Sequence, residues 1–463
     1  MLSLNSSRRF EVAARRGGRW VIDCLARSEN EARARADELY RDESIEAVRV
    51  IRARFGRDGT SFESVLHEQE RPKRQGAAPV RIAAAPAAAA WCETLDDFYG
   101  RASRHAIARL LRNFLDRHGI TPTELLHHQR YMRILERQEN LQGQAVQRMA
   151  TIQAKAREIE PRVRADAIDG FIEQASVRAR DALASRAAPR LGEDGIKALA
   201  DAITSLATGE ADKGFYLRFA ISVAWETNYG PADKLAAIGK WAAEDPSLLP
   251  LIDELAAGLL GAASLVQEVL GAQPHLAGAL STMADLALGH GPEKTPPALA
   301  PFEDLLAAAS MPETRVVLIE RIERELASEK PLSRDDGQMQ RRQFDTLVDK
   351  LVDADGFFVG GPAMVETLAR RSRRLEIVGG IEAVRFRSES VPERLEELFT
   401  HAADAISERQ QRAIGTYFTA LLDEAGDDRG VAEGLRPRIA GLRFPDPLKA
   451  AILSRLANPS TRS

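Results

Sequence analysis

Cysteine is scarce in this sequence, and long apolar runs are missing. The 463 residues include only two cysteines, Cys24 and Cys92, which are far apart and lack the spacing of metal ligands. Such usage excludes a disulfide framework and favours a reducing compartment. No stretch of about 18 apolar residues occurs, so the sequence predicts no membrane-spanning helix. The first 20 residues lack the apolar segment of a signal peptide, and we therefore expect a cytoplasmic protein.

Aromatic residues and lysines are also few. Aromatic side chains make up 6% of the residues, so burial must rely on Ala, Leu, Ile and Val, a mixture that suits close helix packing. Arginine outnumbers lysine more than five to one, which is typical of proteins from GC-rich bacterial genomes. This bias weakens any inference from a single arginine. The net charge of −4 is too small to drive whole-protein binding to nucleic acid or anionic lipid.

Residues 1–70 have the pattern of a small α+β module. Two short apolar runs flank Arg15–Gly18, which is a hairpin-turn signal. Ser28 and Glu31 form a capping box at the start of a helix. A second pair of β-rich segments follows, joined by the turn signal Gly56–Gly59. The order predicts a ββαββ module in which one helix covers one face of a small sheet.

The rest of the chain is predicted to be mostly helical. Residues 71–90 combine prolines with an alanine run and no apolar period, which predicts an extended linker. Residues 91–288 and 302–463 show helical periodicity punctuated by Gly and Pro. The prolines of residues 289–301 predict a second linker between these two helical domains. We therefore expect a mostly α fold, with helical-bundle or α-solenoid-like domains after the N-terminal module.

One helix in the first helical domain is expected to be unusually long. Thr121, Pro122 and Glu124 combine an N-cap, a first-turn proline and a capping-box acid. Few breakers follow, so the pattern predicts a helix over 122–160, as part of a long helical hairpin or coiled-coil arm. We expect that this segment, Thr121–Glu160, can mediate a homodimer.

Metal and cofactor sites are not expected. Four of the eight histidines lie within 24 residues: His105, His118, His127 and His128. No pair has the i, i+4 spacing with a nearby acid that a helical zinc site needs. Asp349–Gly356 resembles a calcium loop only superficially, because the first and twelfth positions are then Leu351 and Pro362. We interpret the histidines as solvated or core residues and Gly356 as the stop of a helix.

Two segments near the C-terminal end are candidate partner or anion contacts. The first is the apolar pair Phe357 and Phe358, which precedes two glycines and a helix. Exposed phenylalanines would form a docking site, whereas the apolar composition favours a loop that is anchored by burial. The second is the densest basic cluster: Arg370, Arg371, Arg373 and Arg374. It suits phosphate contact, but the wide spread of these residues around a helix favours a solvated helix end.

The N-terminal module is a further candidate for nucleic-acid binding. Residues 1–75 carry a net charge of +3, against −7 for the remainder. A small sheet with basic edges and aromatic side chains suits RNA or single-stranded DNA. The aromatic residues concerned are Phe10, Trp20, Phe55 and Phe62. They alternate as core residues do and no RNP-like motif is present, so a protein-binding or structural module is favoured.

The sequence contains no motif for nucleophilic catalysis. It also contains no motif that identifies a protein family. GxSxG and a local Cys–His signature are both missing. We therefore hypothesise a non-enzymatic cytoplasmic adaptor or regulatory scaffold that binds protein partners through helical surfaces. One alternative is a nucleic-acid-associated regulatory protein that uses the N-terminal module or the Arg370–Arg374 cluster. The other is a helical enzyme with an unrecognised site.

Overall fold

The structure is a computed structural model, and it divides the chain into two compact units. The described residues are 9–16, 19–40, 45, 47–55, 61–70, 91–138, 140–192, 194–228, 230–262, 269–270, 273, 275–291, 298–333, 337–377, 380–425 and 429–457. One unit comprises Met1–Val80 and the other Arg81–Ser463. The predicted linker over 71–90 lies outside the described residues.

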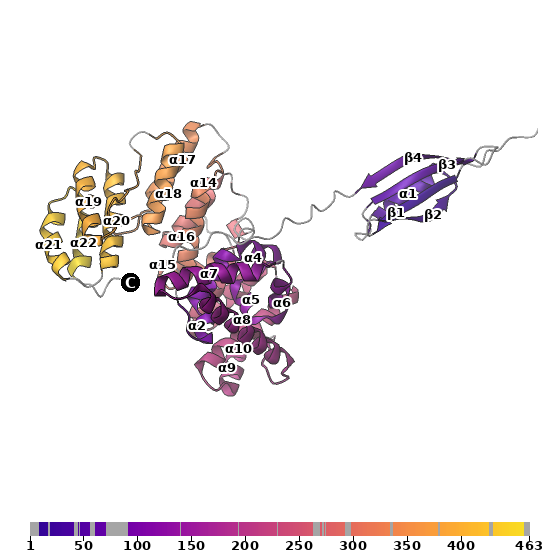
Figure 1. Cartoon of the computed structure of the whole chain (residues 1–463), viewed down its shortest axis with the longest axis horizontal. Helices are drawn as coiled ribbons and strands as arrows, with labels where there is room; N and C mark the ends of the chain where they lie inside the picture. Colours follow the sequence, from indigo (N-terminus) through magenta and orange to yellow (C-terminus); the bar gives the residue numbers. More distant parts are fainter. Residues whose placement is uncertain are drawn as a thin grey trace, which may run out of the picture. The chain divides into compact units, whose positions relative to one another are not determined.

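The N-terminal unit is a four-stranded antiparallel sheet with one helix (Figure 1). Its elements are β1 (Arg9–Arg16), β2 (Arg19–Ala26), α1 (Glu29–Tyr40), β3 (Ala47–Phe55) and β4 (Ser61–Glu70). The strand order is β2-β1-β3-β4, so the two hairpins meet through β1 and β3. At the start of α1 the Ser28 hydroxyl accepts a hydrogen bond from the Glu31 backbone N–H (3.2 Å). The predicted ββαββ order is confirmed.

Alternation of side chains along the strands determines which face of the sheet α1 covers. Phe10, Val12 and Ala14 point to the same side of β1. They are buried together with Ala32 and Ala36 of α1. Helix α1 contacts β1, β2 and β3 from this side. The residues that alternate with Phe10, Val12 and Ala14 in β1 therefore face the opposite way. Among the described residues of this unit, no helix covers that second face.

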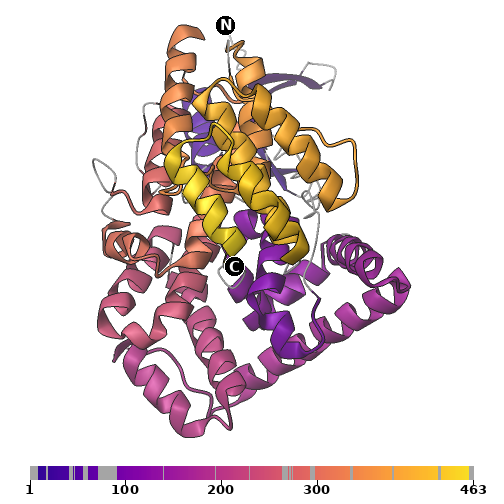
Figure 2. The same ribbon diagram turned by 90° about the vertical axis from the view of Figure 1, so that its left-hand side faces the viewer.

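The second unit is built of helices, as the sequence predicts (Figures 1 and 2). The helices of its first half are α2 (Leu95–Tyr99), α3 (Arg101–Leu110), α4 (Arg112–His118), α5 (Pro122–His127), α6 (Gln129–Glu136), α7 (Leu141–Arg157), α8 (Pro161–Ala184), α9 (Gly195–Leu206), α10 (Glu210–Asn228), α11 (Pro231–Glu244), the 3-10 helix η1 (Pro246–Leu248) and α12 (Leu249–Leu260). The helices of its second half are α14 (Leu276–Leu288), α15 (Ala300–Ala307), α16 (Pro312–Ala327), α17 (Gly337–Lys350), α18 (Gly361–Arg374), α19 (Val391–Asp404), α20 (Glu408–Ala425), α21 (Arg429–Ala440) and α22 (Asp446–Ala457). None of the helices in the described ranges is long and apolar enough to cross a membrane.

The single helix predicted over 122–160 is wrong, because the chain breaks twice in this segment. α5 ends where His128 adopts an extended backbone conformation (φ −122°, ψ 111°). The His128 ring then caps α6, since its Nδ1 accepts a hydrogen bond from the Arg130 backbone N–H (3.2 Å). The second break is at Asn140, the N-cap of α7, which has a left-handed conformation (φ 56°).

The predicted start of α5 is confirmed, while the long hairpin lies further along the chain. Thr121 and Glu124 form the expected capping box, and Pro122 occupies the first turn. All six residues of α5 are buried, so this part of Thr121–Glu160 offers no surface to a second copy. α7 and α8, with 17 and 24 residues, pack against each other as a helical hairpin. In Figure 2 the long α8 lies along an outer edge of the helical unit.

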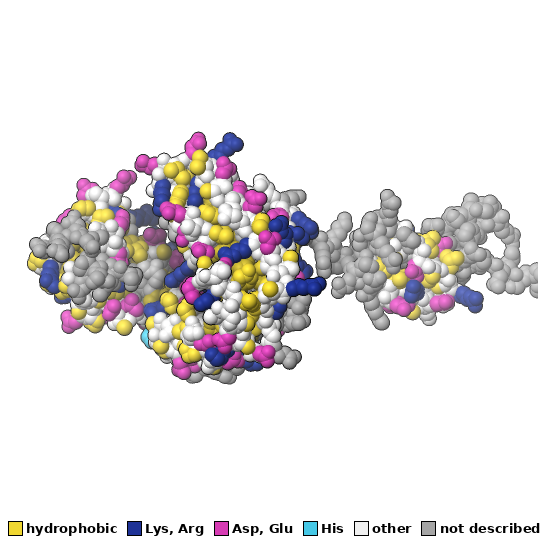
Figure 3. Space-filling model, turned by 90° about the horizontal axis from the view of Figure 1, so that it is seen from below, with side chains coloured by type: hydrophobic (Ala, Val, Ile, Leu, Met, Phe, Trp, Pro, Cys, Tyr) yellow, Lys and Arg dark blue, Asp and Glu magenta, His cyan; other side chains and the backbone are white. Residues whose placement is uncertain are grey.

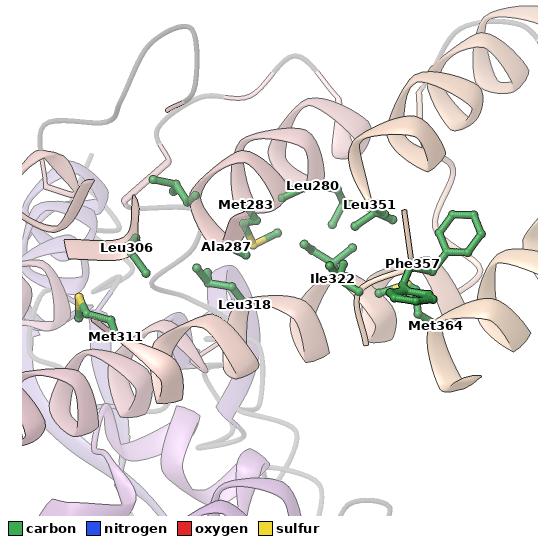
Figure 4. Close-up of a cluster of buried hydrophobic side chains, with 14 of the residues drawn as sticks. Leu280, Met283, Ala287, Leu306, Met311, Leu318, Ile322, Leu351, Phe357 and Met364 are labelled. Carbon is green, nitrogen blue, oxygen red and sulfur yellow. The ribbon is translucent and has the colours of Figure 1, made fainter. Parts of the chain in front are cut away.

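The helical unit has two buried cores, and they do not divide at residues 289–301. The smaller core takes its side chains from α2, α5 to α8 and α10. The larger core extends from Ile196 to Leu456 and therefore crosses the predicted second linker. In Figure 4, Met283 and Leu318, which come from opposite sides of that segment, lie in the same cluster. The larger core therefore includes side chains from both of the helical domains predicted on either side of 289–301.

A buried carboxylate joins the two cores. Glu254 of α12 is 3% exposed and accepts hydrogen bonds from Arg218 Nη2 of α10 (2.6 Å) and from the Thr123 hydroxyl of α5 (2.7 Å). Arg104 Nη2 of α3 lies 3.1 Å from the same carboxylate. Burial alone would raise the pKa of Glu254, but the two guanidinium groups hold it below its usual value. Four helices are thus connected through one charged side chain.

The adjacent Asp253 fixes the position of α16 against α12. Its two carboxylate oxygens accept hydrogen bonds from the backbone N–H groups of Glu313 and Thr314 (both 2.8 Å). The N-cap residue of α16, Met311, has no capping side chain of its own. A carboxylate at a helix N-terminus satisfies free N–H groups and is favoured by their partial positive charge. Asp253 therefore acts as an N-cap supplied by a different helix.

Replacing Glu254 by Gln tests the junction between the cores. The amide keeps the shape of the side chain but leaves the buried guanidinium groups of Arg104 and Arg218 without their counter-ion. We expect the free energy of unfolding, measured by urea denaturation, to fall by about 3–5 kcal/mol. Glu210→Gln is the control, because the Glu210 side chain is 89% exposed and its loss should cost less than about 1 kcal/mol. Equal losses in both variants would contradict the proposed junction.

Candidate functional site

The predicted arginine cluster does not form one continuous basic surface. Arg370, Arg373 and Arg374 of α18 are exposed, whereas Arg371 is 2% exposed. Arg371 Nη1 donates a hydrogen bond to the carbonyl of Ser328 (2.7 Å), and its Nη2 donates one to the carbonyl of Lys330. Arg374 Nη1 donates to the Ser328 carbonyl as well (2.8 Å). Two of the four guanidinium groups therefore cap the C-terminal end of α16.

Phe357 and Phe358 are not presented to a partner, because they are 4% and 2% exposed. They lie in a turn after α17, which a bridge between Val352 and Phe358 closes and in which Gly356 has a left-handed conformation (φ 90°). The Phe358 backbone N–H donates to the hydroxyl of Thr416 in α20 (3.0 Å). Figure 4 shows Phe357 among the side chains of the larger core. The docking interpretation is thus wrong, and anchoring by burial is the arrangement found.

The four clustered histidines lie in separate surroundings. His105 pairs with Glu320 (3.2 Å) and His128 pairs with Glu226 (3.0 Å). The His118 ring packs against Phe114, with ring centroids 4.6 Å apart. Within the described ranges, no three His, Cys, Asp or Glu side chains come together as a metal site requires.

His127 is fully buried and is held in its neutral form. Its ring lies between Tyr99 and Phe215, with centroid distances of 4.7 and 5.5 Å. Nδ1 is 2.8 Å from the Thr123 carbonyl, which accepts a hydrogen bond and so assigns the ring proton to Nδ1. Burial lowers the pKa of His127 to about 3, and the nearby Arg218 acts in the same direction. This histidine is therefore a core residue without a charge at neutral pH.

The charged groups around Glu254 do not form a reaction site. A cavity of about 50 Å³ adjoins them, with Arg104, His105 and Glu313 in its wall. Burial raises the pKa of Glu313 above its usual value, and Glu254 adds to this effect although Arg104 opposes it. A space of this volume holds a few water molecules rather than a substrate. The converging acids and bases bind one another, so the cluster is a structural junction.

The sequence interpretation missed Asp253 and Glu254, although α12 carries a signal. The helix is LPLIDELAAGLL, and these carboxylates are its only charged side chains. Charges in the middle of an apolar helix need partners if that helix is buried. The partners Arg104 and Arg218 lie on helices far away in the sequence, and only the tertiary structure identifies them.

The uncovered face of the N-terminal sheet is the candidate functional site. Strand register places Leu25, Glu11, Ile51 and Val65 in one row across all four strands, on the side opposite α1. Leu25 is 57% and Val65 is 53% exposed, and Ile22, in the next row, is 55% exposed. An antiparallel sheet with one solvated face normally has polar residues on that face. Three exposed aliphatic side chains are instead typical of an interaction surface.

Charged groups lie within and beside this apolar patch, which we define as Ile22, Leu25 and Val65; Ile51, in the same row, is only 6% exposed. Figure 3 shows hydrophobic side chains between charged ones on the described part of this unit. The ion pairs between described residues of the unit are Arg33–Glu29, Arg35–Asp23 and Arg35–Glu38. Glu11 belongs to none of them, although it lies between Leu25 and Ile51. Nearby, the Arg49 guanidinium stacks over the Trp20 ring at 4.3 Å.

Comparisons with known proteins add no functional constraint. No family model matches the chain, and no curated protein or solved structure matches it. The function is therefore inferred from the geometry of the described residues.

Arg371 should contribute to the stability of the protein, whereas its exposed neighbour Arg370 on α18 should not. Arg371→Gln removes the donors to the carbonyls of Ser328 and Lys330, which follow α16, and we expect the free energy of unfolding to fall by about 1–3 kcal/mol. Arg370→Gln makes the same charge change at an exposed position and should change it by less than about 0.5 kcal/mol. Urea denaturation of both variants measures the difference. Indistinguishable midpoints would show that Arg371 does not cap α16.

His127 should make the protein less stable as the pH falls. The unfolded chain binds a proton at this histidine below its ordinary pKa of about 6.5, whereas the folded protein does so only near pH 3. Stability is therefore complete above pH 6.5 and falls by about 1.4 kcal/mol per pH unit between these values. His127→Phe keeps a ring between Tyr99 and Phe215. It should remove one proton from the uptake on unfolding, and so reduce the slope of stability against pH by about 1.4 kcal/mol per pH unit. The exposed His401→Phe serves as the control, and an unchanged slope in His127→Phe would refute the assignment.

Proposed function

We propose that this protein is a non-enzymatic adaptor or regulatory protein that binds a protein partner through the open face of its N-terminal sheet. The observation that carries the proposal is the exposure of Ile22, Leu25 and Val65 on a face that is usually polar. The sheet and α1 form a compact unit by themselves, which suits a binding module. In the helical unit, the predicted contact residues Phe357, Phe358 and Arg371 are engaged in internal packing and hydrogen bonds.

An amphipathic helix with a basic residue in its apolar face fits this surface. Strands are about 4.8 Å apart, so the row from Leu25 to Val65 spans about 14 Å, which exceeds the diameter of about 10 Å of one helix. α1 already covers the other face of the sheet in this manner. Glu11 lies in the middle of the row and is not ion-paired to another described residue. A Lys or Arg of the partner helix would supply the opposite charge.

The two alternative functions have less support from the described contacts. For nucleic-acid binding, Arg370 and Arg373 are exposed and could contact phosphate groups. On the module, however, the open face carries the carboxylates of Glu11 and Glu68, which oppose phosphate binding. A helical enzyme would need a cleft with converging polar groups, and the cluster at Glu254 adjoins only a small cavity. Both alternatives stay predictions.

Site-specific photo-crosslinking in the cell that produces the protein tests the proposal. A photoreactive residue replaces Leu25 or Val65 of the full-length chain, and the control replaces Arg33, which is exposed on α1. We expect positions 25 and 65 to give the same adduct with a different protein, and position 33 to give none. Glu11→Lys, combined with the photoreactive residue at position 25, should lower the adduct yield about tenfold, which corresponds to about 1.4 kcal/mol.

Four results would contradict the proposal. The first three are the absence of an adduct at positions 25 and 65, an adduct with nucleic acid, and an adduct of equal yield at position 33. The fourth is an adduct between two copies of the chain, which would mean that the surface forms a homodimer and does not bind a different protein.

A further inference from the structure

An apolar cavity of about 110 Å³ lies inside the smaller core of the helical unit. Helices α2, α3, α5, α6, α7 and α8 all contribute to its wall. Much of that wall is aliphatic, and buried members include Leu110, Leu126, Val146 and Ile168. Protein interiors are close-packed, so a space of this size leaves the lining atoms without contacts that a bound molecule would restore.

The lining of the cavity is uncharged. Its polar side chains are Cys92, Ser103, Gln142 and Gln153, and none of the lining residues is Asp, Glu, Lys, Arg or His. The Ser103 hydroxyl donates to the Asp97 carbonyl (3.0 Å), and Gln153 Oε1 accepts from Arg164 Nε (2.6 Å). A charged ligand would lose its hydration here without gaining a counter-ion in the wall. The chemistry of the wall therefore selects a neutral, mainly hydrocarbon molecule.

The guanidinium group of Arg164, which bonds to the lining residue Gln153, is fully engaged in contacts with the protein. Arg164 is 3% exposed, and its Nη2 donates to the Cys92 carbonyl (2.9 Å) and lies 3.0 Å from Cys92 Sγ. Its guanidinium also stacks over the Trp91 ring at 3.9 Å. These contacts, with the bond to Gln153, attach the chain before α2 to α7 and α8. Arg164 thus forms one end of the site without being part of its wall.

The volume sets the size of the ligand, and the partly exposed lining residues indicate its route of entry. An apolar protein cavity of roughly 150 Å³ binds benzene, so 110 Å³ suits a single aromatic ring with a small adjustment of the wall. Ile107 of α3, Met149 of α7 and Ile172 of α8 line the cavity and are only half-buried. Entry between these helices requires side-chain movement, which the flexible Met149 permits.

We propose that this cavity is a binding site for a small uncharged apolar molecule, about the size of one aromatic ring. The site is independent of the open sheet face, because it lies in the helical unit and shares no residue with the N-terminal module. The protein would then combine a partner-binding surface with a separate small-molecule site.

Protection of Cys92 in the full-length protein tests this site directly. Cys92 lines the cavity, whereas Cys24 lies in the N-terminal unit and serves as a control within the same molecule. Benzene, toluene and indole are the probes, and mass spectrometry follows the alkylation of each thiol by iodoacetamide. At a probe concentration of about ten times Kd, alkylation of Cys92 should slow about tenfold while that of Cys24 stays unchanged. The same probes should raise the melting temperature.

Two variants and one matched control connect the protection to the cavity. Ala106→Leu adds volume to the buried wall, and we expect it to abolish protection by all three probes. Leu110→Ala enlarges the cavity, and it should admit naphthalene, which the unaltered protein excludes. Ala167→Leu makes the first substitution on the exposed side of α8 and should leave binding intact.

The charge of the ligand supplies the decisive comparison. Benzoate and benzylammonium have the size of toluene but carry a charge, so neither should protect Cys92. Equal protection by benzoate and toluene would overturn the argument from the neutral wall. The proposal fails completely if no neutral probe slows alkylation of Cys92 or raises the melting temperature up to its solubility limit. Neither failure would affect the crosslinking result at positions 25 and 65.

Discussion

The contact of Glu254 with Arg218, Arg104 and Thr123 is the constraint on which the helical unit depends. A buried carboxylate is tolerated only when its counter-ions are present, so α3, α10 and α12 can pack in this arrangement only together. A second buried pair, Lys234 with Glu124 (2.6 Å), connects α11 to α5 in the same region. Apolar packing is tolerant of small shifts, whereas these bonds have defined lengths and directions. The junction between the two cores is therefore specified by polar contacts, with apolar packing on both sides.

This use of charge limits where function can be located. The groups that usually perform chemistry, such as His127, Glu254 and Arg371, are buried and committed to internal bonds. Among the described residues, the apolar patch of the N-terminal sheet and the neutral cavity of the smaller core are not used in this way. One is a surface and suits a macromolecule, and the other is an interior space and suits a small ligand. They lie in different units, so each can be altered without disturbing the other.

Predictions of hydrogen bonds within one helical turn were accurate, whereas predictions that depended on how distant segments pack were not. The capping box of Thr121 and Glu124 is present as expected, since it involves bonds within one turn. The helix over 122–160 is broken at His128 because α5 is buried against α10 and other helices, which outweighs the helical pattern. Trp20 was assigned to the core by alternation, yet it lies on the open face beside Arg49.

The amino-acid sequence by itself determined the mostly α class, the ββαββ order and the starts of α1 and α5. These properties depend on side-chain periodicity and on hydrogen bonds that span only a few residues, so neighbouring positions contain the necessary information. Only the tertiary structure decided that Arg371 caps α16, that Phe357 is a core residue, and that Leu25 is exposed. It also decided where the smaller core leaves space unfilled. The reason is that burial, charge pairing and free volume arise where segments distant in the chain meet, and no local pattern specifies those meetings.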